Sequence, residues 1–134
     1  MRTSREPIPV TNVTRIRLLR FAFYASLLIA LVAAILPSLP LSAAASGELQ
    51  HISAFVVLSV LAWTAFPSTS AWQLAAVLCG FGALIELVQA IPALQRDASL
   101  YDWAIDCMTV GVCFVLLGLK ARIRSARENG AGGK

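Results

Sequence analysis

Charged residues are scarce in this sequence. Asp, Glu, Lys and Arg make up 13% of its 134 residues, which is about half the share found in an ordinary soluble domain. Hydrophobic residues make up 58%. This amount of charge is too small to cover a surface that faces water. A soluble globular protein is therefore excluded, and a membrane protein is expected. The length allows one domain.

Motifs that carry known chemistry are also missing. The sequence contains no H-E-x-x-H, G-x-S-x-G or P-loop pattern, so no nucleophile or metalloprotease motif supports catalysis. The three cysteines, Cys79, Cys107 and Cys113, are odd in number, lie within apolar runs and form no C-x-x-C pair. They indicate neither a disulfide framework nor a redox site, and we interpret them as small packing residues.

Four apolar runs are present between the two polar ends of the chain. They lie at residues 21–36, from residue 48 or 51 to 67, 71–91 and 100–119. Each is close to the roughly 20 residues that a helix needs to cross a membrane. The sequence therefore predicts an all-α fold, a four-helix transmembrane bundle over residues 21–119. A basic tail, 1–20, precedes it and a basic, glycine-rich tail, 120–134, follows it, and we expect residues 1–14 to be flexible.

The basic residues predict the orientation of the spans. Of the eleven Lys and Arg residues, five precede the first apolar run and five follow the fourth. Lys and Arg concentrate on the cytoplasmic side of membrane proteins, so both termini are expected in the cytoplasm and the number of spans is expected to be even. Because topology explains the basic charge, nucleic-acid binding is not implied.

The first apolar run has a second interpretation. A basic flank, an apolar stretch and the small residues of LSAAAS are also typical of a signal peptide cleaved near residue 45. Cleavage would leave three spans, an odd number, which disagrees with the basic residues at both ends. The sequence favours four spans and leaves this alternative open.

The segment 86–106, ELVQAIPALQRDASLYDWAID, places charge between the last two apolar runs. An ionisable group at the centre of a membrane span costs about 2.5–3.5 kcal/mol, so such groups usually serve a function. Glu86 and Gln89 are spaced i, i+3, and Asp102 and Asp106 are spaced i, i+4. Each pair therefore shares one face of its helix.

Glu48 and His51 form a third pair of this kind at the start of the second run. The predicted topology places all three pairs, together with Arg96 and Asp97, toward the outer side of the membrane. Asp97 itself suits an exposed loop. Repulsion among the partly buried carboxylates predicts a site that holds protons, a cation or a cationic partner.

Structural roles also account for several of these residues. Ser99 and Asp102 resemble a capping box at the start of the fourth run. Arg96 is either a solvated loop charge or the partner of nearby carboxylates, and His51 suits an interfacial position. Glu86 lies inside the run ALIEL without an adjacent cation, so for it we favour a functional role.

The strings HISAFVVLSVL at 51–61 and LIELVQAIPALQRDASLYDWAID at 84–106 carry a family resemblance. A histidine that opens an apolar span, followed by an E-x-x-Q…R…S…D pattern, resembles the VanZ-like membrane proteins, over about residues 48–118. The resemblance implies a bacterial protein of four or five spans, from a family named for a member linked to low-level teicoplanin resistance. It also implies the signature positions His51, Glu86, Gln89, Arg96, Ser99 and Asp102.

The chain departs from the family pattern at three places. Gly47 and Glu48 stand where the family has D-K in D-K-x-x-H, so a lysine that would neutralise the acids is missing. Asp106 stands where Asn is usual, and Thr109 where a glycine is expected. The first two changes make the cluster more acidic, which strengthens the prediction of a proton or cation site.

Three classes of function remain open. In the first, a multi-pass protein of the bacterial inner membrane binds a polar ligand on its outer side, such as a lipid-linked cell-wall precursor, with a link to glycopeptide resistance. In the second, the protein is a membrane-embedded enzyme acting on a phosphorylated or peptide envelope substrate. In the third, it is an assembly factor whose polar groups form interhelical hydrogen bonds. Membrane lipids are expected partners, and the oligomeric state is not predicted.

The first class defines a candidate ligand-binding site, and no residue is assigned a catalytic role. The candidate ligand-binding residues are His51, Glu86, Gln89, Arg96, Ser99, Asp102 and Asp106. A divalent cation is a candidate cofactor, because imidazole and carboxylate groups are its common ligands in proteins. The candidate metal ligands are His51, Glu86, Asp102 and Asp106.

Overall fold

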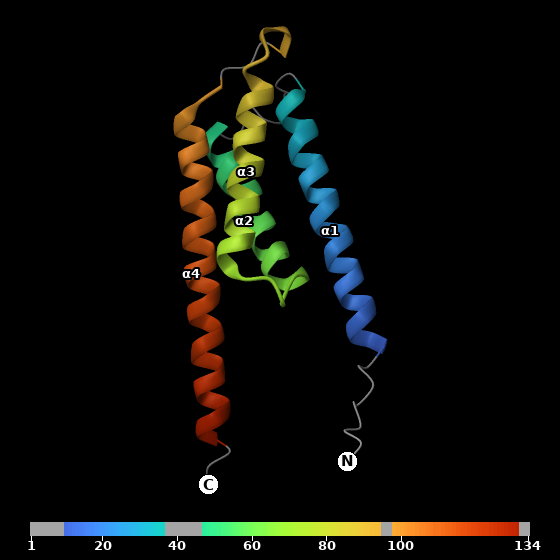
Figure 1. Cartoon of the computed structure of the whole chain (residues 1–134), viewed down its shortest axis with the longest axis vertical. Coiled ribbons are helices and arrows are strands. Elements are labelled where there is room, and N and C mark those ends of the chain that lie inside the picture. Colours follow the sequence, from blue (N-terminus) through green and yellow to red (C-terminus); the bar gives the residue numbers. More distant parts are fainter. Residues whose placement is uncertain (1–9, 37–46, 95–97, 132–134) are drawn as a thin grey trace.

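The computed structural model describes residues 10–36, 47–94 and 98–131 of the chain. This part of the chain is helical, without strands, and consists of α1 (Val10–Ile35), α2 (Gly47–Ala65), α3 (Ala71–Gln89), the short 3-10 helix η2 (Pro92–Leu94) and α4 (Leu100–Ala131). The four long helices run alongside one another, with the start of α1 and the end of α4 at the same end of the bundle (Figure 1). The predicted all-α, four-helix bundle is confirmed.

The four long helices are also membrane spans by length and composition. The stretches long and apolar enough to cross a membrane are Asn12–Ile35, Gly47–Ala65, Ala71–Gln89 and Leu100–Gly130. The chain is therefore a membrane protein. Large apolar side chains point outward from the bundle: Leu28, Leu87 and Val115 are 62%, 70% and 69% exposed. In a membrane such side chains face lipid tails, which are as apolar as they are.

α1 and α4 are longer than the apolar runs that predict them. α1 begins at Val10, so the expectation of a flexible segment is wrong for residues 10–14, while residues 1–9 lie outside the described part of the chain. α4 continues to Ala131 through a stretch rich in Lys, Arg and Ala, which are good helix formers. Hydropathy marks where a helix leaves the membrane, whereas helix propensity decides where its backbone hydrogen bonds end.

The ends of the inner helices follow from local chemistry. Pro67 begins the turn two residues after α2 ends at Ala65, and Pro92 begins η2 after α3. Proline lacks a backbone N–H and restricts the residue before it, so helices commonly end just ahead of it. Ser70 precedes α3 and Ser99 precedes α4, as expected for residues whose hydroxyl oxygen competes for the free N–H groups of a first turn.

α2 occupies the centre of the packing. It packs against α1, α3 and α4, and its contacts with α1 and α4 are the most extensive in the bundle, while α3 also touches the other three helices and packs mainly on α4. The buried apolar core consists of Phe23, Ala34, Phe55, Leu58, Ala62, Leu74, Leu78, Ile85, Val110 and Phe114. Trp63 of α2 packs on Phe114 of α4 with ring centroids 5.8 Å apart. This core fixes how each helix is rotated about its axis, and the rotation decides which polar side chains meet.

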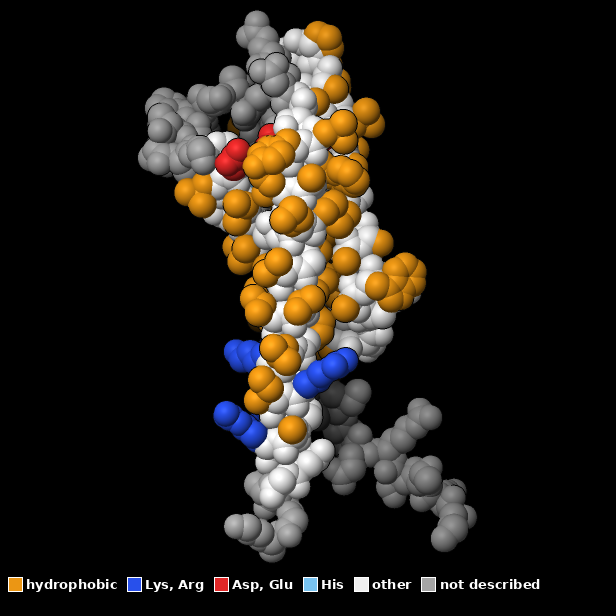
Figure 2. Space-filling view, turned by 90° about the vertical axis from the view of Figure 1, so that its left-hand side faces the viewer, with side chains coloured by type: hydrophobic (Ala, Val, Ile, Leu, Met, Phe, Trp, Pro, Cys, Tyr) orange, Lys and Arg blue, Asp and Glu red, His pale blue; other side chains and the backbone are white. Residues whose placement is uncertain are grey.

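Charged side chains separate along the bundle. On the face shown in Figure 2, acidic side chains lie near one end and the Lys and Arg side chains of α4 near the other, with an apolar surface between them. We call the end formed by the start of α2, the end of α3 and the start of α4 the acidic end. The opposite end, where α1 begins, α2 turns into α3 and α4 ends, is the basic end.

Candidate functional site

His51 of α2 and Asp106 of α4 form a buried polar pair at the acidic end. His51 Nδ1 lies 3.2 Å from both Oδ1 and Oδ2 of Asp106. The Asp106 side chain is fully buried, and that of His51 is 18% exposed. Because a carboxylate can only accept hydrogen bonds, Nδ1 carries the proton and donates it. In the neutral ring, Nε2 is then the atom that can accept a proton or bind a metal ion.

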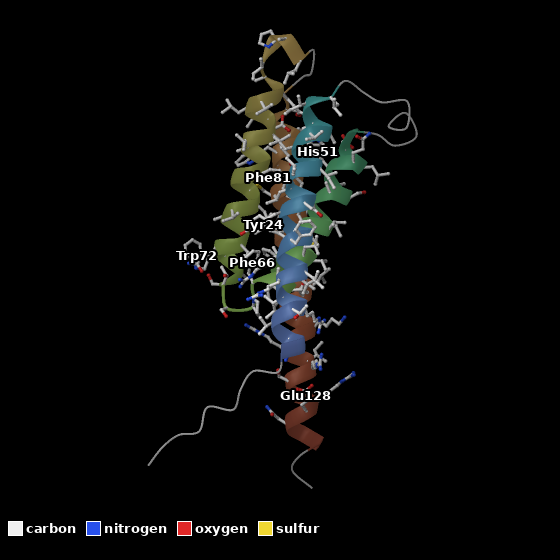
Figure 3. The ribbon with its side chains drawn as sticks, turned by 90° about the vertical axis from the view of Figure 1, so that its right-hand side faces the viewer. Tyr24, His51, Phe66, Trp72, Phe81 and Glu128 are labelled. Atoms are coloured by element: carbon white, nitrogen blue, oxygen red, sulfur yellow. The ribbon has the colours of Figure 1, made fainter. Side chains whose placement is uncertain are left out.

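Figure 3 shows His51 toward the acidic end, with Phe81, Tyr24 and Phe66 at successive levels toward the basic end and Glu128 beyond them. The polar pair therefore sits near one end of the bundle. A fully buried carboxylate is strongly desolvated, so its contact with the imidazole is what makes the position tolerable for folding.

Gly82 of α3 lies against the Asp106 side chain and leaves room for it. A Cβ placed on Gly82 of α3 would lie 3.2 Å from Asp106 Oδ2, 3.3 Å from Phe55 Cζ and 3.4 Å from Trp103 Cδ1. These distances are tighter than most contacts of a real Cβ, so a larger residue at this position would require the neighbouring side chains to shift by a few tenths of an ångström. The absence of a side chain at this position lets α3 approach α4 closely. At Gly80 an added Cβ would meet nothing within 4 Å, so of these two glycines of α3 only Gly82 makes a contact of this kind.

A hydrogen bond joins the start of α4 to α3. Ser99 Oγ accepts the Asp102 N–H at 3.2 Å, which is the first bond of the predicted capping box. The second bond of such a box would join the Asp102 carboxylate to the Ser99 N–H. In its place, Glu86 Oε2 of α3 accepts that N–H at 2.6 Å. Ser99 therefore caps α4, while the Asp102 carboxylate does not complete the box.

His51, Glu86 and Asp102 meet from three different helices. Each offers one nitrogen or oxygen atom suited to a metal ion, and these three atoms lie within 4.8 Å of one another. The second Glu86 oxygen, Oε1, is enclosed and has no hydrogen-bond partner among the described residues. A buried polar atom without a partner costs about 1–3 kcal/mol. The arrangement is therefore unfavourable for folding by itself and suited to binding a cation or a hydrogen-bond donor.

Two hollows border this cluster. A cleft of about 120 Å³ between α1, α2 and α3 has His51 and Gln89 in its lining. A larger hollow of about 500 Å³, which we call the α3–α4 groove, is lined by Ala83, Glu86, Leu87, Ala90, Ala98, Ser99, Leu100 and Trp103. Its walls are apolar except at Glu86 and Ser99 and at the indole N–H of Trp103. The groove thus joins an apolar surface to the polar cluster.

The structure brings five of the predicted ligand-binding residues together: His51, Glu86, Ser99, Asp102 and Asp106. Gln89 is buried and lines the small cleft beside His51. Arg96 and Asp97 lie outside the described residues. Glu48 is exposed in the first turn of α2, where the helix dipole favours a negative charge. The cluster is therefore smaller than the set of polar residues that the topology placed on this side.

Trp103 is a contact of the site that the sequence interpretation missed. Its Nε1 donates to the backbone carbonyl of Cys79 on α3 at 3.0 Å, and its ring borders the α3–α4 groove. This bond fastens α4 to α3 beside the polar cluster. The available signal was chemical, because an indole N–H inside an apolar span needs an acceptor and tends to turn toward one.

The fold and this geometry define a class of protein, a four-helix membrane protein with an acidic site between α2, α3 and α4. Comparison of the chain with protein-family models, with curated proteins and with solved structures found no match. The resemblance to the VanZ-like proteins therefore stays a prediction.

Proposed function

We propose that this chain is a VanZ-like protein of the bacterial inner membrane that binds the polar head of a lipid-linked, cell-wall-related amphiphile. The observation that carries the proposal is the position of Glu86, which lines the α3–α4 groove and also belongs to the polar cluster. One carboxylate thus borders a hollow for an apolar chain and a pocket for a polar head.

The groove suits an apolar chain entering from the membrane. Ala83, Ala90 and Ala98 line it with small side chains. Leu87 and Leu100 also line it and are 70% and 82% exposed, so the groove lies on a surface that faces lipid. Its volume of about 500 Å³ falls in the range of small-molecule sites, which are mostly apolar with a few placed polar groups.

The polar cluster suits a head group rich in hydrogen-bond donors. The imidazole of His51 and the carboxylates of Glu86 and Asp102 each place one ligand atom within 4.8 Å of the others, and this group of polar atoms matches hydroxyl and amide groups of a sugar or peptide. Such bonds to a charged acceptor are stronger than neutral ones. A phosphate on the same ligand would need a cation between it and these carboxylates, or the guanidinium of Arg96 as the sequence predicts.

The orientation belongs to the proposal. With both termini in the cytoplasm, the basic residues of α1 and α4 lie at the inner surface and the acidic end faces the outer leaflet. Cell-wall precursors and the glycopeptides that bind them meet at that side of the membrane. A protein that binds such a precursor there offers a route to low-level teicoplanin resistance, to which the member that gives the family its name is linked.

A catalytic role is the second candidate, and the His51–Asp106 pair favours it. A carboxylate that accepts from Nδ1 fixes the imidazole and leaves Nε2 as a general base. Glu86 and Asp102 stand within reach of the same point. If the protein is an enzyme, Glu86→Gln should abolish turnover of an envelope substrate while leaving its affinity within a few-fold; in a pure binder the same change should weaken affinity.

Native mass spectrometry of the full chain purified from bacterial membranes tests the binding proposal. The wild-type protein should retain an amphiphile, and Ala83→Trp, which fills the α3–α4 groove, should lose it. Ala76→Trp is the matched control, because Ala76 is an exposed alanine on the same helix that does not line the groove. Equal retention by the two variants, or no amphiphile on the wild-type protein, would contradict the proposal.

A further inference from the structure

We infer that His51, Glu86 and Asp102 form a binding site for one divalent transition-metal ion, with Asp106 as the residue that positions His51. This inference goes beyond the proposed amphiphile, because a metal held by these three side chains does not require the amphiphile to bind. The three donors come from α2, α3 and α4, so an ion at this point would join the inner helices of the bundle.

The distances allow coordination after a small movement. The donor atoms of His51, Glu86 and Asp102 lie within 4.8 Å of one another. In a tetrahedral site with metal–ligand bonds of about 2.0–2.2 Å, two ligands of one ion lie about 3.3–3.6 Å apart. The most widely separated donors therefore need to approach by up to about 1.5 Å, which rotation of the carboxylate and imidazole side chains can supply.

An unpartnered oxygen provides a second, independent observation. Glu86 Oε2 already accepts the Ser99 N–H at 2.6 Å, whereas Oε1 is enclosed and has no partner among the described residues. That one bond holds the carboxylate in place and leaves one oxygen free. A metal ion would satisfy this oxygen, so it removes a cost that the bundle otherwise bears.

Asp106 supplies the outer contact that metal-binding histidines usually have. A ligating histidine commonly donates its other ring N–H to a carboxylate, which fixes the tautomer and the ring orientation. His51 Nδ1 donates to Asp106 at 3.2 Å, so Nε2 is the nitrogen available to an ion. Asp106 is fully buried and held on both sides by His51 and the close approach of Gly82, so it orients the imidazole and is not itself a ligand.

Charge and donor type narrow the choice of metal. Three carboxylates gather here, and none has a Lys or Arg partner among the ion pairs of the described residues, so a divalent cation would offset most of their repulsion. One imidazole nitrogen and two carboxylate oxygens suit Zn²⁺, Mn²⁺ or Fe²⁺, whereas Mg²⁺ and Ca²⁺ prefer oxygen ligands alone. Three protein ligands leave a position open for a water molecule or for a group of a bound ligand.

Titration of the purified, metal-stripped full chain with Zn²⁺ and Mn²⁺ tests the site. Isothermal calorimetry should show one ion per chain for at least one of the two metals. Glu86→Gln and Asp102→Asn, which keep side-chain size, should weaken binding about 100-fold or more, and Asp106→Asn about 10- to 100-fold through loss of orientation. Glu48→Gln, an exposed acid one turn from His51 on α2, should bind like the wild type.

Folding of each variant is checked separately, by far-ultraviolet circular dichroism and thermal unfolding of the metal-free protein. In addition, saturating metal should raise the melting temperature of the wild type and of Glu48→Gln but not that of Glu86→Gln. The inference is overturned if neither metal binds at one ion per chain, or if Glu86→Gln binds as tightly as Glu48→Gln. Absence of an amphiphile from the wild-type protein in native mass spectrometry, together with metal binding at one ion per chain, would instead contradict only the proposed function.

Discussion

The two ends of the bundle satisfy their polar groups in different ways. At the basic end, polar groups are satisfied by helix caps and by an arginine. Gln73 Oε1 accepts a hydrogen bond from the Ser70 N–H at 3.2 Å and one from Ser70 Oγ at 2.7 Å. Arg20 Nε donates to the last carbonyl of α2, Ala65 O, at 3.2 Å, and its guanidinium lies 5.2 Å from the centre of the Phe66 ring. Helix capping and a cation over an aromatic ring explain these contacts without any ligand.

At the acidic end the partners come from three helices and do not satisfy one another. The imidazole of His51 and the carboxylates of Glu86, Asp102 and Asp106 converge, with Glu86 Oε1 left unpartnered. Conformational stability would be served better by apolar side chains in these places. The contacts at the basic end stabilise the fold, whereas the polar groups at the acidic end destabilise it until a cation or ligand binds to them.

The largest effect on this comparison is expected from Asp106→Ala. The change leaves the largely buried His51 N–H without its acceptor and opens a cavity in the core, so the free energy of unfolding should fall by about 3–5 kcal/mol. Asp106→Asn, which keeps one acceptor oxygen, should cost clearly less. Thermal unfolding in detergent measures both. Equal melting temperatures for the two variants would mean that the histidine contact is not what holds Asp106.

Gly82→Leu should come next. The new side chain meets Asp106, Phe55 and Trp103, so overpacking should lower the free energy of unfolding by about 1–3 kcal/mol. Gly80→Leu meets nothing within 4 Å and should hold or raise stability, because glycine is a poor helix former. The idea of a close approach at Gly82 fails if both variants unfold at the same temperature.

Trp103→Phe should have a smaller effect. It removes the N–H that donates to the Cys79 carbonyl and keeps most of the ring, so the expected loss is about 0.5–1.5 kcal/mol. Trp72→Phe is the comparison, since Trp72 is 72% exposed and projects away from the bundle (Figure 3). Similar shifts in melting temperature for both variants would remove the role given to the indole N–H.

Arg124→Ala at the basic end should have the smallest effect. The ion pair between Arg124 and Glu128 is an exposed contact between successive turns of α4, 2.9 Å long, and such pairs contribute about 0.3–0.5 kcal/mol at most. A loss as large as that of Trp103→Phe would show that the basic end also depends on its charges for stability, against the contrast drawn between the ends.

The helices could be predicted from the sequence, and the pairing of polar groups only in part. Apolar runs located the spans, because burial in lipid depends on composition. The spacing of Asp102 and Asp106 showed that they share a face, yet could not tell which of them meets His51, since that depends on the rotation of α4 against α2. No pattern in the sequence showed that Glu86 accepts a hydrogen bond from the Ser99 N–H, because this contact joins two different helices.

The stability of metal-free Glu86→Gln tests the central claim most directly. If the acidic end is kept for binding, this variant should melt at the wild-type temperature or above it, because it removes one charge and keeps an oxygen for the Ser99 N–H, and it should no longer gain stability from Zn²⁺ or Mn²⁺. A fall in melting temperature approaching that of Asp106→Ala would contradict the claim and make Glu86 a structural residue.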